Sequence, residues 1–251
     1  LKEYIDRIIF VRDDFKNAEV FLDGLGIGAL DGVLLDLGVS SYQLDEAERG
    51  FSYMKDAPLD MRMDKGQSLD AYAVVNGYSE QELARIFREY GEEKLAGKIA
   101  ARIVREREKQ PVATTLQLAK LVTESYPPAT RWKFGHPAKR VFQAVRIEVN
   151  GELEGLGESV KWLARRLREG GKMAVITFHS LEDRIVKNCF KELATACTCP
   201  PDFPVCVCGG KAEVKIETAK PLTASAAELE QNTRAESAKL RVVRRIGTTK
   251  A

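Results

Sequence analysis

The chain has 251 residues, of which 44% are hydrophobic and 30% are charged, so it can bury a substantial core. No apolar run approaches the roughly 18 to 20 residues that a membrane-spanning helix needs, and no secretory signal core follows the charged start. A cytoplasmic protein without membrane contact is therefore expected. The formal net charge is only +2, so any nucleic-acid role must depend on where charges cluster.

The first part of the chain alternates between apolar runs and helical periodicity. Residues 7–11 and 33–37 are short β-branched runs typical of buried strands, and residues 17–25 between them have helical spacing. This strand–helix–strand order predicts a parallel sheet. From about residue 46 to residue 137 the period changes to 3.6, which predicts a helical insertion. Its clearest helices are expected at 80–90, 93–108 and 115–126.

The sheet pattern returns in the second half of the chain. Amphipathic helices are expected at 139–150 and 160–169. The glycine pair at 170–171 is expected to stop the second helix before a buried strand at 173–178. Two more strands, with a polar helix-prone stretch between them, are expected at 213–217 and 238–246.

Polar residues directly follow two of the expected buried strands. Asp36 interrupts the end of the first, and a glycine turn and two hydroxyls, Ser40 and Ser41, come after it. Ligands of open α/β sheets bind beyond the carboxyl ends of the strands, so these side chains are candidates for function. The structural alternative is that Asp36 caps a turn and that Ser40 or Ser41 starts a helix.

His179 follows the second of these strands. Ser180 fits the N-cap of a following helix, because Asp183 lies three residues later. His179 would then lie at a helix N-terminus, at the same sheet edge as Asp36, where it could contact a ligand or substrate. A hydrogen-bonded structural histidine is the commoner alternative.

The helix expected at 139–150 has a polar face beside its apolar stripe. The residues of this face, spaced four, three and four apart, are Lys139, Gln143, Arg146 and Asn150. Such a face is most often simply solvated, but basic and amide groups also suit RNA phosphates and base edges. Residues 131–146 contain five basic residues, including Arg140, and no carboxylate, which favours RNA binding. His136, just before the helix, either contacts the substrate or fixes the helix entry.

Four of the five cysteines fall within a stretch of twelve residues. They form two C-x-C pairs, Cys197 with Cys199 and Cys206 with Cys208. Four thiolates can hold one zinc ion, although this spacing differs from the common C-x-x-C pattern. Unligated thiols in a reducing cytosol are the alternative.

Four segments of the chain carry a family resemblance. They are residues 31–64 (DGVLLDLGVSSYQLDEAERGFSYMKDAPLDMRMD), 135–150 (GHPAKRVFQAVRIEVN), 176–188 (ITFHSLEDRIVKN) and 237–242 (SAKLRV). In these segments, which follow the family order over nearly the whole chain, the sequence closely resembles the RsmH family of methyltransferases, also called MraW. Members of that family make N4-methylcytidine in the decoding region of bacterial 16S rRNA.

The resemblance implies an α/β fold in which a Rossmann-like class I methyltransferase sheet is interrupted by an all-helical domain. The methyltransferase domain is expected at 1–45 and 141–251, and the insertion at 46–140. The resemblance further implies S-adenosyl-L-methionine as the cofactor, with contacts that come from Phe15, Asp36 and Gln43. Tyr42 departs from the proline that the family usually has at this position.

The same resemblance implies 16S rRNA or the small ribosomal subunit as the partner. Asp36 is the first candidate for holding the hydrogens of the cytosine amine, with Ser40, Ser41 and His179 in support. No metal is expected in this reaction. The substrate contacts are expected from His136, Lys139, Arg140, Gln143, Arg146 and Asn150. The oligomeric state stays open, with a homodimer among the alternatives.

The family has further cofactor-binding features upstream of the region matched here. These are a glycine-rich loop after its first strand and an acidic residue after its second, which holds the cofactor ribose. Neither is found before residue 14 of this chain. A native protein that is longer by two strands and a helix is therefore expected, and its intact mass would show the difference.

Two other functions compete with this one. A DNA amino-methyltransferase would share the cofactor and the amine chemistry, but the proline-proline-aromatic run usual in that class does not follow Asp36. A non-catalytic RNA-binding protein with a methyltransferase-like fold is the second alternative, because the glycine-rich loop is missing. Transfer of a labelled methyl group to ribosomal subunits, compared with DNA, would separate them.

Overall fold

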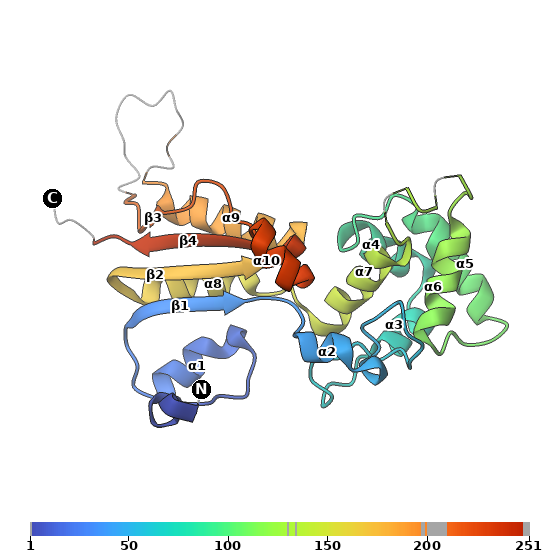
Figure 1. Ribbon diagram of the computed structural model, residues 1–251, viewed down its shortest axis with the longest axis horizontal. Helices are drawn as coiled ribbons and strands as arrows, with labels where there is room; N and C mark the ends of the chain where they lie inside the picture. Colours follow the sequence, from blue (N-terminus) through green and yellow to red (C-terminus); the bar gives the residue numbers. More distant parts are fainter. Residues whose placement is uncertain (1, 130, 134, 197–198, 200–209, 248–251) are drawn as a thin grey trace. The chain divides into compact units, whose positions relative to one another are not determined.

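The computed structural model describes residues 2–129, 131–133, 135–196, 199 and 210–247 (Figure 1). The chain divides into two compact units, which are Leu1–Gly38 together with Leu153–Ala251, and Val39–Glu152. Each unit buries its own set of apolar side chains, so the chain has two separate hydrophobic cores. The segment expected to form the insertion, residues 46–140, lies inside the second unit.

The first unit is built on a four-stranded sheet with the order β1-β2-β4-β3 (Figure 1). Its strands are β1 (Leu30–Asp36), β2 (Leu167–Thr177), β3 (Val214–Ile216) and β4 (Lys239–Arg245). β1 and β2 run parallel, whereas β4 is antiparallel to both of its neighbours. This confirms the strands expected around 33–37, 173–178, 213–217 and 238–246, in a sheet that is mixed rather than wholly parallel.

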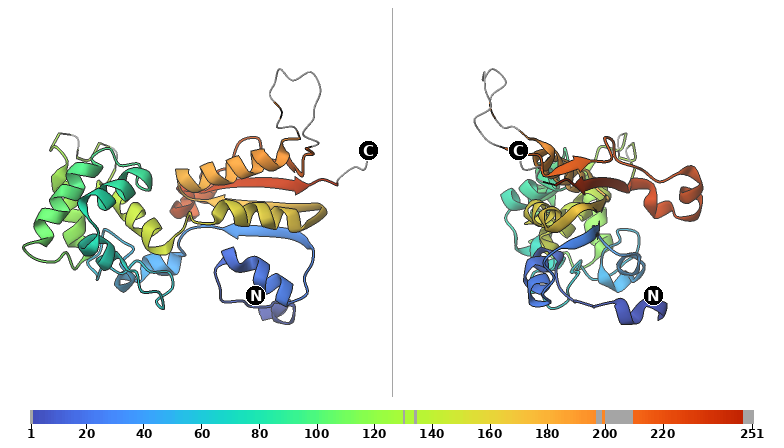
Figure 2. Two further views of the ribbon diagram at one scale, coloured as in Figure 1. Left: turned by 180° about the vertical axis from the view of Figure 1, so that it is seen from behind. Right: turned by 90° about the vertical axis from the view of Figure 1, so that its left-hand side faces the viewer.

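Two helices, α8 (Leu156–Arg166) and α9 (Ser180–Ala194), lie side by side on one face of this sheet (Figure 2). Val160 of α8 and Phe190 of α9 are buried in one core with Val175 of β2. Burying such side chains stabilises the layer by about 1.5–3 kcal/mol each. The shorter helices of this unit are η1 (Lys2–Arg7), η2 (Phe15–Asn17), α1 (Ala18–Gly24), α10 (Ala226–Gln231) and η4 (Thr233–Ser237).

The strand expected at residues 7–11 is wrong. η1 ends at Arg7, and the following residues form no regular element, with Ile9 and Phe10 65% and 72% exposed. A strand needs a neighbour for its backbone hydrogen bonds, and no described strand pairs with this segment. Composition alone therefore does not make these residues a strand.

The expected helix stop at the glycine pair is also wrong. α8 ends at Arg166, and β2 begins at the next residue and includes both glycines. Gly170 has φ of 81°, and a Cβ on Gly171 would lie 3.0 Å from the carbonyl oxygen of Asp31. The glycines thus allow the close approach and the register shift of β1 and β2 near Leu30.

The second unit has helices and no β-strand among its described residues, although isolated β-bridges occur. Its helices are α2 (Ser41–Asp45), η3 (Ala47–Arg49), α3 (Ala71–Gly77), α4 (Glu80–Glu89), α5 (Ala96–Arg107), α6 (Thr115–Ser125) and α7 (Ala138–Asn150). The four helices expected between residues 80 and 150 are confirmed within a few residues. Ser79 and Glu82 form a capping box that starts α4. No described helix of the chain has the length and apolarity to cross a bilayer.

Candidate functional site

The carboxyl ends of β1 and β2 lie side by side. Asp36, the last residue of β1, pairs with Ile176 of β2, and the backbone N–H of Leu37 donates to the Ile176 carbonyl at 3.1 Å. Further on, a Cβ on Gly38 would lie 3.6 Å from the Phe178 ring. This confirms that the chain segments after the two strands are neighbours at one sheet edge.

Asp36 is exposed at this edge. Leu35 and Leu37 on either side of it are buried, so the alternation of the strand directs Asp36 away from the core. Gly38 has φ of 86°, a left-handed conformation that turns the chain without the strain of a Cβ. Within the described part of the chain, no hydrogen bond or ion pair engages the Asp36 carboxylate, so it can accept hydrogen bonds from a ligand.

His179 is the N-cap of α9, and only 7% of its side chain is exposed. Its Nδ1 accepts the backbone N–H of Glu182 at 3.5 Å, and its Nε2 lies 3.2 Å from Oε1 of the Glu182 carboxylate. Despite this proximity, the buried Nε2 makes no hydrogen bond within the described residues. His179 therefore fixes the start of α9 through Nδ1 alone.

Glu182 completes this cap, and the sequence patterns did not single it out. Its Oε2 accepts the backbone N–H groups of Phe178 at 2.9 Å and of His179 at 3.3 Å, and the residue is 2% exposed. A carboxylate three residues after a cap is the signature of a capping box. The spacing of His179 and Glu182 could therefore have revealed the role of Glu182 if histidine had been considered as a cap.

The N-cap expected at Ser180 is thus wrong by one residue. Asp183, its expected partner, pairs instead with Arg241 of β4 through bonds of 2.7 and 3.0 Å. This hydrogen bonding by Arg241 lowers the pKa of the Asp183 carboxyl. The pair links the first turn of α9 to the strand beside β2.

Ser40 and Gln43 form a capping box at the start of α2, in the second unit. The Oγ of Ser40 accepts the backbone N–H of Gln43 at 3.3 Å, and Oε1 of Gln43 accepts the backbone N–H of Ser40 at 2.9 Å. The structural alternative for Ser40 is therefore confirmed. Ser41 is the exposed first residue of this helix. Within the described residues, Nε2 of Gln43 donates no hydrogen bond.

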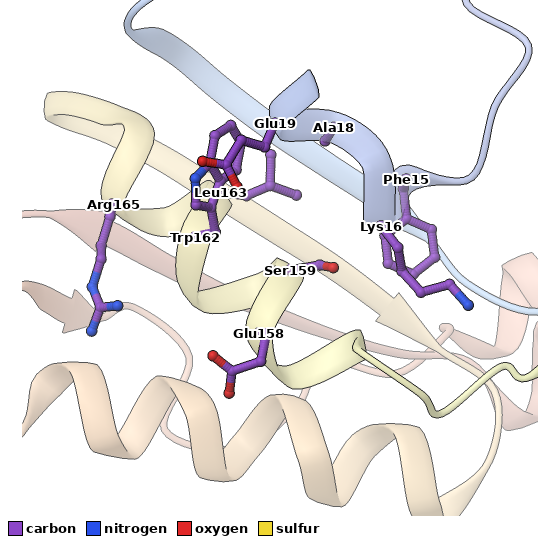
Figure 3. A pocket seen from close by; sticks show the side chains of 9 residues that line it. All are labelled: Phe15, Lys16, Ala18, Glu19, Glu158, Ser159, Trp162, Leu163 and Arg165. Atoms are coloured by element: carbon purple, nitrogen blue, oxygen red, sulfur yellow. The ribbon is translucent and has the colours of Figure 1, made fainter. Parts of the chain in front are cut away.

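Phe15 begins η2 and lines a cavity of about 280 Å³ in the first unit (Figure 3). Asp14 stabilises this turn, because its carboxylate accepts the backbone N–H of Lys16 at 2.9 Å. The remaining lining residues are Lys16, Ala18, Glu19, Glu158, Ser159, Trp162, Leu163 and Arg165. Neither Asp36 nor His179 is among them, so the cavity is distinct from the two strand ends.

Two members of the polar face of α7 bond within the second unit. The Nε2 of Gln143 donates to the carbonyl of Tyr90 at 2.8 Å. Arg146 makes two hydrogen bonds to the Glu152 carboxylate, both of 2.8 Å. The regular spacing of this face therefore has a structural explanation at these two positions.

Asn150, the last residue of the same face, holds the loop at residues 61–63. Its Oδ1 accepts the backbone N–H of Met63 at 2.7 Å, and its Nδ2 donates to the carbonyls of Met61 and Arg146, each at 2.8 Å. Met61 is fully buried and has φ of 58°, a left-handed conformation that costs a non-glycine residue about 1–2 kcal/mol. Asn150 thus stabilises a strained turn.

Replacing Asn150 by alanine is expected to lower the free energy of unfolding by about 2–4 kcal/mol, because three hydrogen bonds are lost and backbone groups of the loop are left without partners. Urea denaturation followed by circular dichroism measures the change. Lys139→Ala, on the same helix but exposed, is the matched control and should stay within about 0.5 kcal/mol of the parent. Equal stability of both variants would contradict the structural role of Asn150.

Lys139 and Arg140 are exposed at the start of α7. One guanidinium nitrogen of Arg140 donates to the carbonyl of Glu92 at 3.4 Å. The Nδ1 of His136 accepts the backbone N–H of Ala138 at 3.2 Å, and burial lowers the pKa of this histidine. The alternative that His136 fixes the helix entry therefore fits the geometry.

The four cysteines considered as zinc ligands lie largely outside the described residues. Only Cys199 of this group is described, so the zinc hypothesis stays a prediction. The fifth cysteine, Cys189, is buried in α9 with its sulfur 3.6 Å from the carbonyl oxygen of Gly157. Burial raises the pKa of the Cys189 thiol, which keeps it protonated near pH 7.

Residues 1–246 match the model of the MraW methylase family. The ribosomal RNA small subunit methyltransferase H of Clostridium botulinum strain Loch Maree is 54% identical over 246 residues, which cover 98% of this chain and 79% of the relative. The proteins of the same name from Brevibacillus brevis and Symbiobacterium thermophilum are 51% and 53% identical. Their alignments cover 98% and 97% of this chain and 78% and 76% of the relatives. The chain therefore belongs to the MraW methylase family and is a methyltransferase.

Proposed function

We propose that this protein transfers a methyl group from S-adenosyl-L-methionine to N4 of a cytidine in the decoding region of bacterial 16S rRNA. The observation that carries the proposal is the unpartnered, exposed carboxylate of Asp36 at the adjoining ends of β1 and β2. The names of the relatives, ribosomal RNA small subunit methyltransferase H, support the RNA substrate. We further propose that residues 46–140, which lie within the second unit, are a helical insertion in a class I methyltransferase domain that acts in the cytoplasm.

The residues assigned to S-adenosyl-L-methionine have suitable chemistry. Phe15 offers a half-buried aromatic ring, which suits stacking with a purine. The carboxylate of Asp36 suits donors and positive charge, and among the described residues it has no competing partner. The Nε2 of Gln43 can donate to a ligand, since only its Oε1 is used in the cap of α2. Each of these three side chains, taken by itself, therefore offers a group that suits this cofactor.

S-adenosyl-L-methionine, when bound, supplies a methyl group that its positively charged sulfur makes electrophilic. The exocyclic amine of cytosine is a poor nucleophile because its lone pair is conjugated with the ring. A carboxylate that accepts a hydrogen of this amine favours a pyramidal nitrogen and stabilises the positive charge that develops there. We assign this role to Asp36, with Ser40 and Ser41 as further acceptors and His179 as a positioning residue that holds the loop after β2.

We propose that the second unit binds RNA around the target nucleotide. A cytosine must leave its stack before an enzyme can reach its amine, so the flanking RNA must be held elsewhere. Lys139 and Arg140 are exposed cations suited to phosphates. We place His136, Gln143, Arg146 and Asn150 in the same interface, mainly as residues that stabilise α7 and the turn before it.

The test is methyl transfer to isolated small ribosomal subunits. Incubation with S-adenosyl-L-methionine labelled in its methyl group is expected to place the label in N4-methylcytidine of 16S rRNA. Nucleoside digestion followed by mass spectrometry identifies the modified position. Naked 16S rRNA, assayed in parallel, shows whether the assembled subunit is required.

Duplex DNA is the control that tests the rival substrate. A DNA amino-methyltransferase would transfer the label to DNA and leave the ribosomal subunits unlabelled, which would contradict the proposal. Label at a position of the RNA other than N4 of cytidine would contradict the assigned amine chemistry while leaving the RNA substrate intact.

A further inference from the structure

Trp132 is the 59% exposed end of a row of four contacting aromatic rings. Its ring meets that of His136 edge to face, with centroids 5.2 Å apart and planes at 72°. His136 stacks on Tyr53 at 4.5 Å and 25°, and Tyr53 meets Phe142 edge-on at 5.7 Å. Phe142 lies in the core of the second unit. The aromatic array consists of these four residues: Trp132, His136, Tyr53 and Phe142.

The aromatic array is anchored to the start of α7. Nδ1 of His136 accepts the backbone N–H of Ala138 at 3.2 Å, and the His136 carbonyl accepts that of Lys139 at 3.1 Å. Burial lowers the pKa of His136, so the ring is neutral near pH 7 and keeps Nδ1 as an acceptor. Because its inner rings are fixed, Trp132 loses little conformational freedom when it binds a partner.

The chain around Trp132 is rich in positive charge. Residues 131–146 contain five basic residues and no carboxylate. Arg131 and Arg146 are used inside the unit, since the first donates to a backbone carbonyl and the second pairs with a carboxylate. Lys139 and Arg140, in the first turn of α7, are exposed to a ligand.

We propose that Trp132 stacks on an unpaired base of the RNA substrate while Lys139 and Arg140 bind neighbouring phosphates. This inference rests on the proposed function, because it names a contact that the RNA substrate would make. An exposed aromatic ring beside cations is the combination that binds single-stranded nucleic acid, since every base has a face that can stack. A duplex hides those faces, so Trp132 selects an unpaired segment.

The test uses the fluorescence of Trp132. The sequence contains two tryptophans, so Trp162→Phe leaves Trp132 as the sole indole. Without any methyl donor, an unpaired RNA of about 12 nucleotides is expected to quench this fluorescence and to yield a Kd. In the full chain, Trp132→Ala is expected to weaken binding of the same RNA about tenfold, and Trp132→Phe less, because a smaller ring still stacks.

An abasic RNA of the same length is the matched ligand control. It keeps the phosphates but lacks the bases, so Trp132→Ala should leave its affinity unchanged, whereas Lys139→Ala should weaken both RNAs and reduce the dependence on salt. An unchanged melting temperature of each variant shows that the fold is intact.

Equal affinity of the parent and Trp132→Ala for unpaired RNA overturns the inference. Quenching by duplex RNA that matches quenching by the single strand, or stronger quenching by vesicles of anionic phospholipid, also overturns it. Because the assay contains no methyl donor, failure of methyl transfer to ribosomal RNA would contradict the proposed function and leave the result for Trp132 standing.

Discussion

Replacing Asp36 by alanine is expected to lower the rate of methyl transfer by at least about 100-fold, because the acceptor proposed for the hydrogens of the cytosine amine is lost. Asp36→Asn should fall between the parent and the alanine variant, since its amide oxygen accepts a hydrogen bond without carrying charge. Single-turnover transfer of a labelled methyl group to small ribosomal subunits measures the rate. Equilibrium binding of S-adenosyl-L-methionine, measured separately, shows how much of the loss is in cofactor affinity.

Asp31, on the same strand, provides the matched control. Its side chain is exposed and lies near the other end of β1 from Asp36. There it pairs with Arg168 of β2. Asp31→Ala should therefore leave methyl transfer unchanged and stability within about 1 kcal/mol. If Asp36→Ala kept both cofactor affinity and rate, the central role of that carboxylate would be ruled out.

Glu182→Ala is expected to lower the free energy of unfolding by about 2–4 kcal/mol, because the backbone N–H groups of Phe178 and His179 lose their buried acceptor. Methyl transfer should fall as well, since the loop beside Asp36 is no longer fixed. Glu182→Gln keeps an acceptor oxygen and should be milder in both respects. Urea denaturation and the methyl-transfer assay, applied to the same preparations, measure the two effects.

Glu192 lies on the same helix as Glu182 and provides the comparison. Its side chain is 61% exposed and pairs with Lys161 at 2.9 Å. Glu192→Ala should change the free energy of unfolding by about 0–1 kcal/mol. A loss as small as this in Glu182→Ala would mean that the buried cap contributes little to the fold.

The elements that could be predicted from sequence depend on local patterns. The helices of the second unit repeat every 3.6 residues and carry their own start signals, as Ser79 and Glu82 do for α4. β2 was predictable because its apolar run from Met173 onward is continuous, with Met173 and Val175 buried and Ala174 and Ile176 half-buried. Asp36 could be singled out because a carboxylate at the end of such a run has few structural explanations.

The features that could not be predicted depend on distant partners. Residues 8–11 have the composition of a strand, but only a neighbouring backbone decides whether a strand forms. The spacing of Asn150 places it on a polar face, yet it cannot show that Met63, 87 residues earlier, packs there. The cap of α9 was misplaced because histidine is not among the usual capping residues.

The first unit consists of two chain segments separated by the 114 residues of the second unit. β1 and β2 come from opposite sides of this separation and pair in parallel. Closing a loop of that length costs an unfolded chain about 4 kcal/mol in conformational entropy. When the second unit is already folded, this cost is smaller and β1 and β2 pair faster. Assembly of the sheet edge that carries Asp36 is therefore coupled, during synthesis, to prior folding of a unit that contributes no described strand to the sheet.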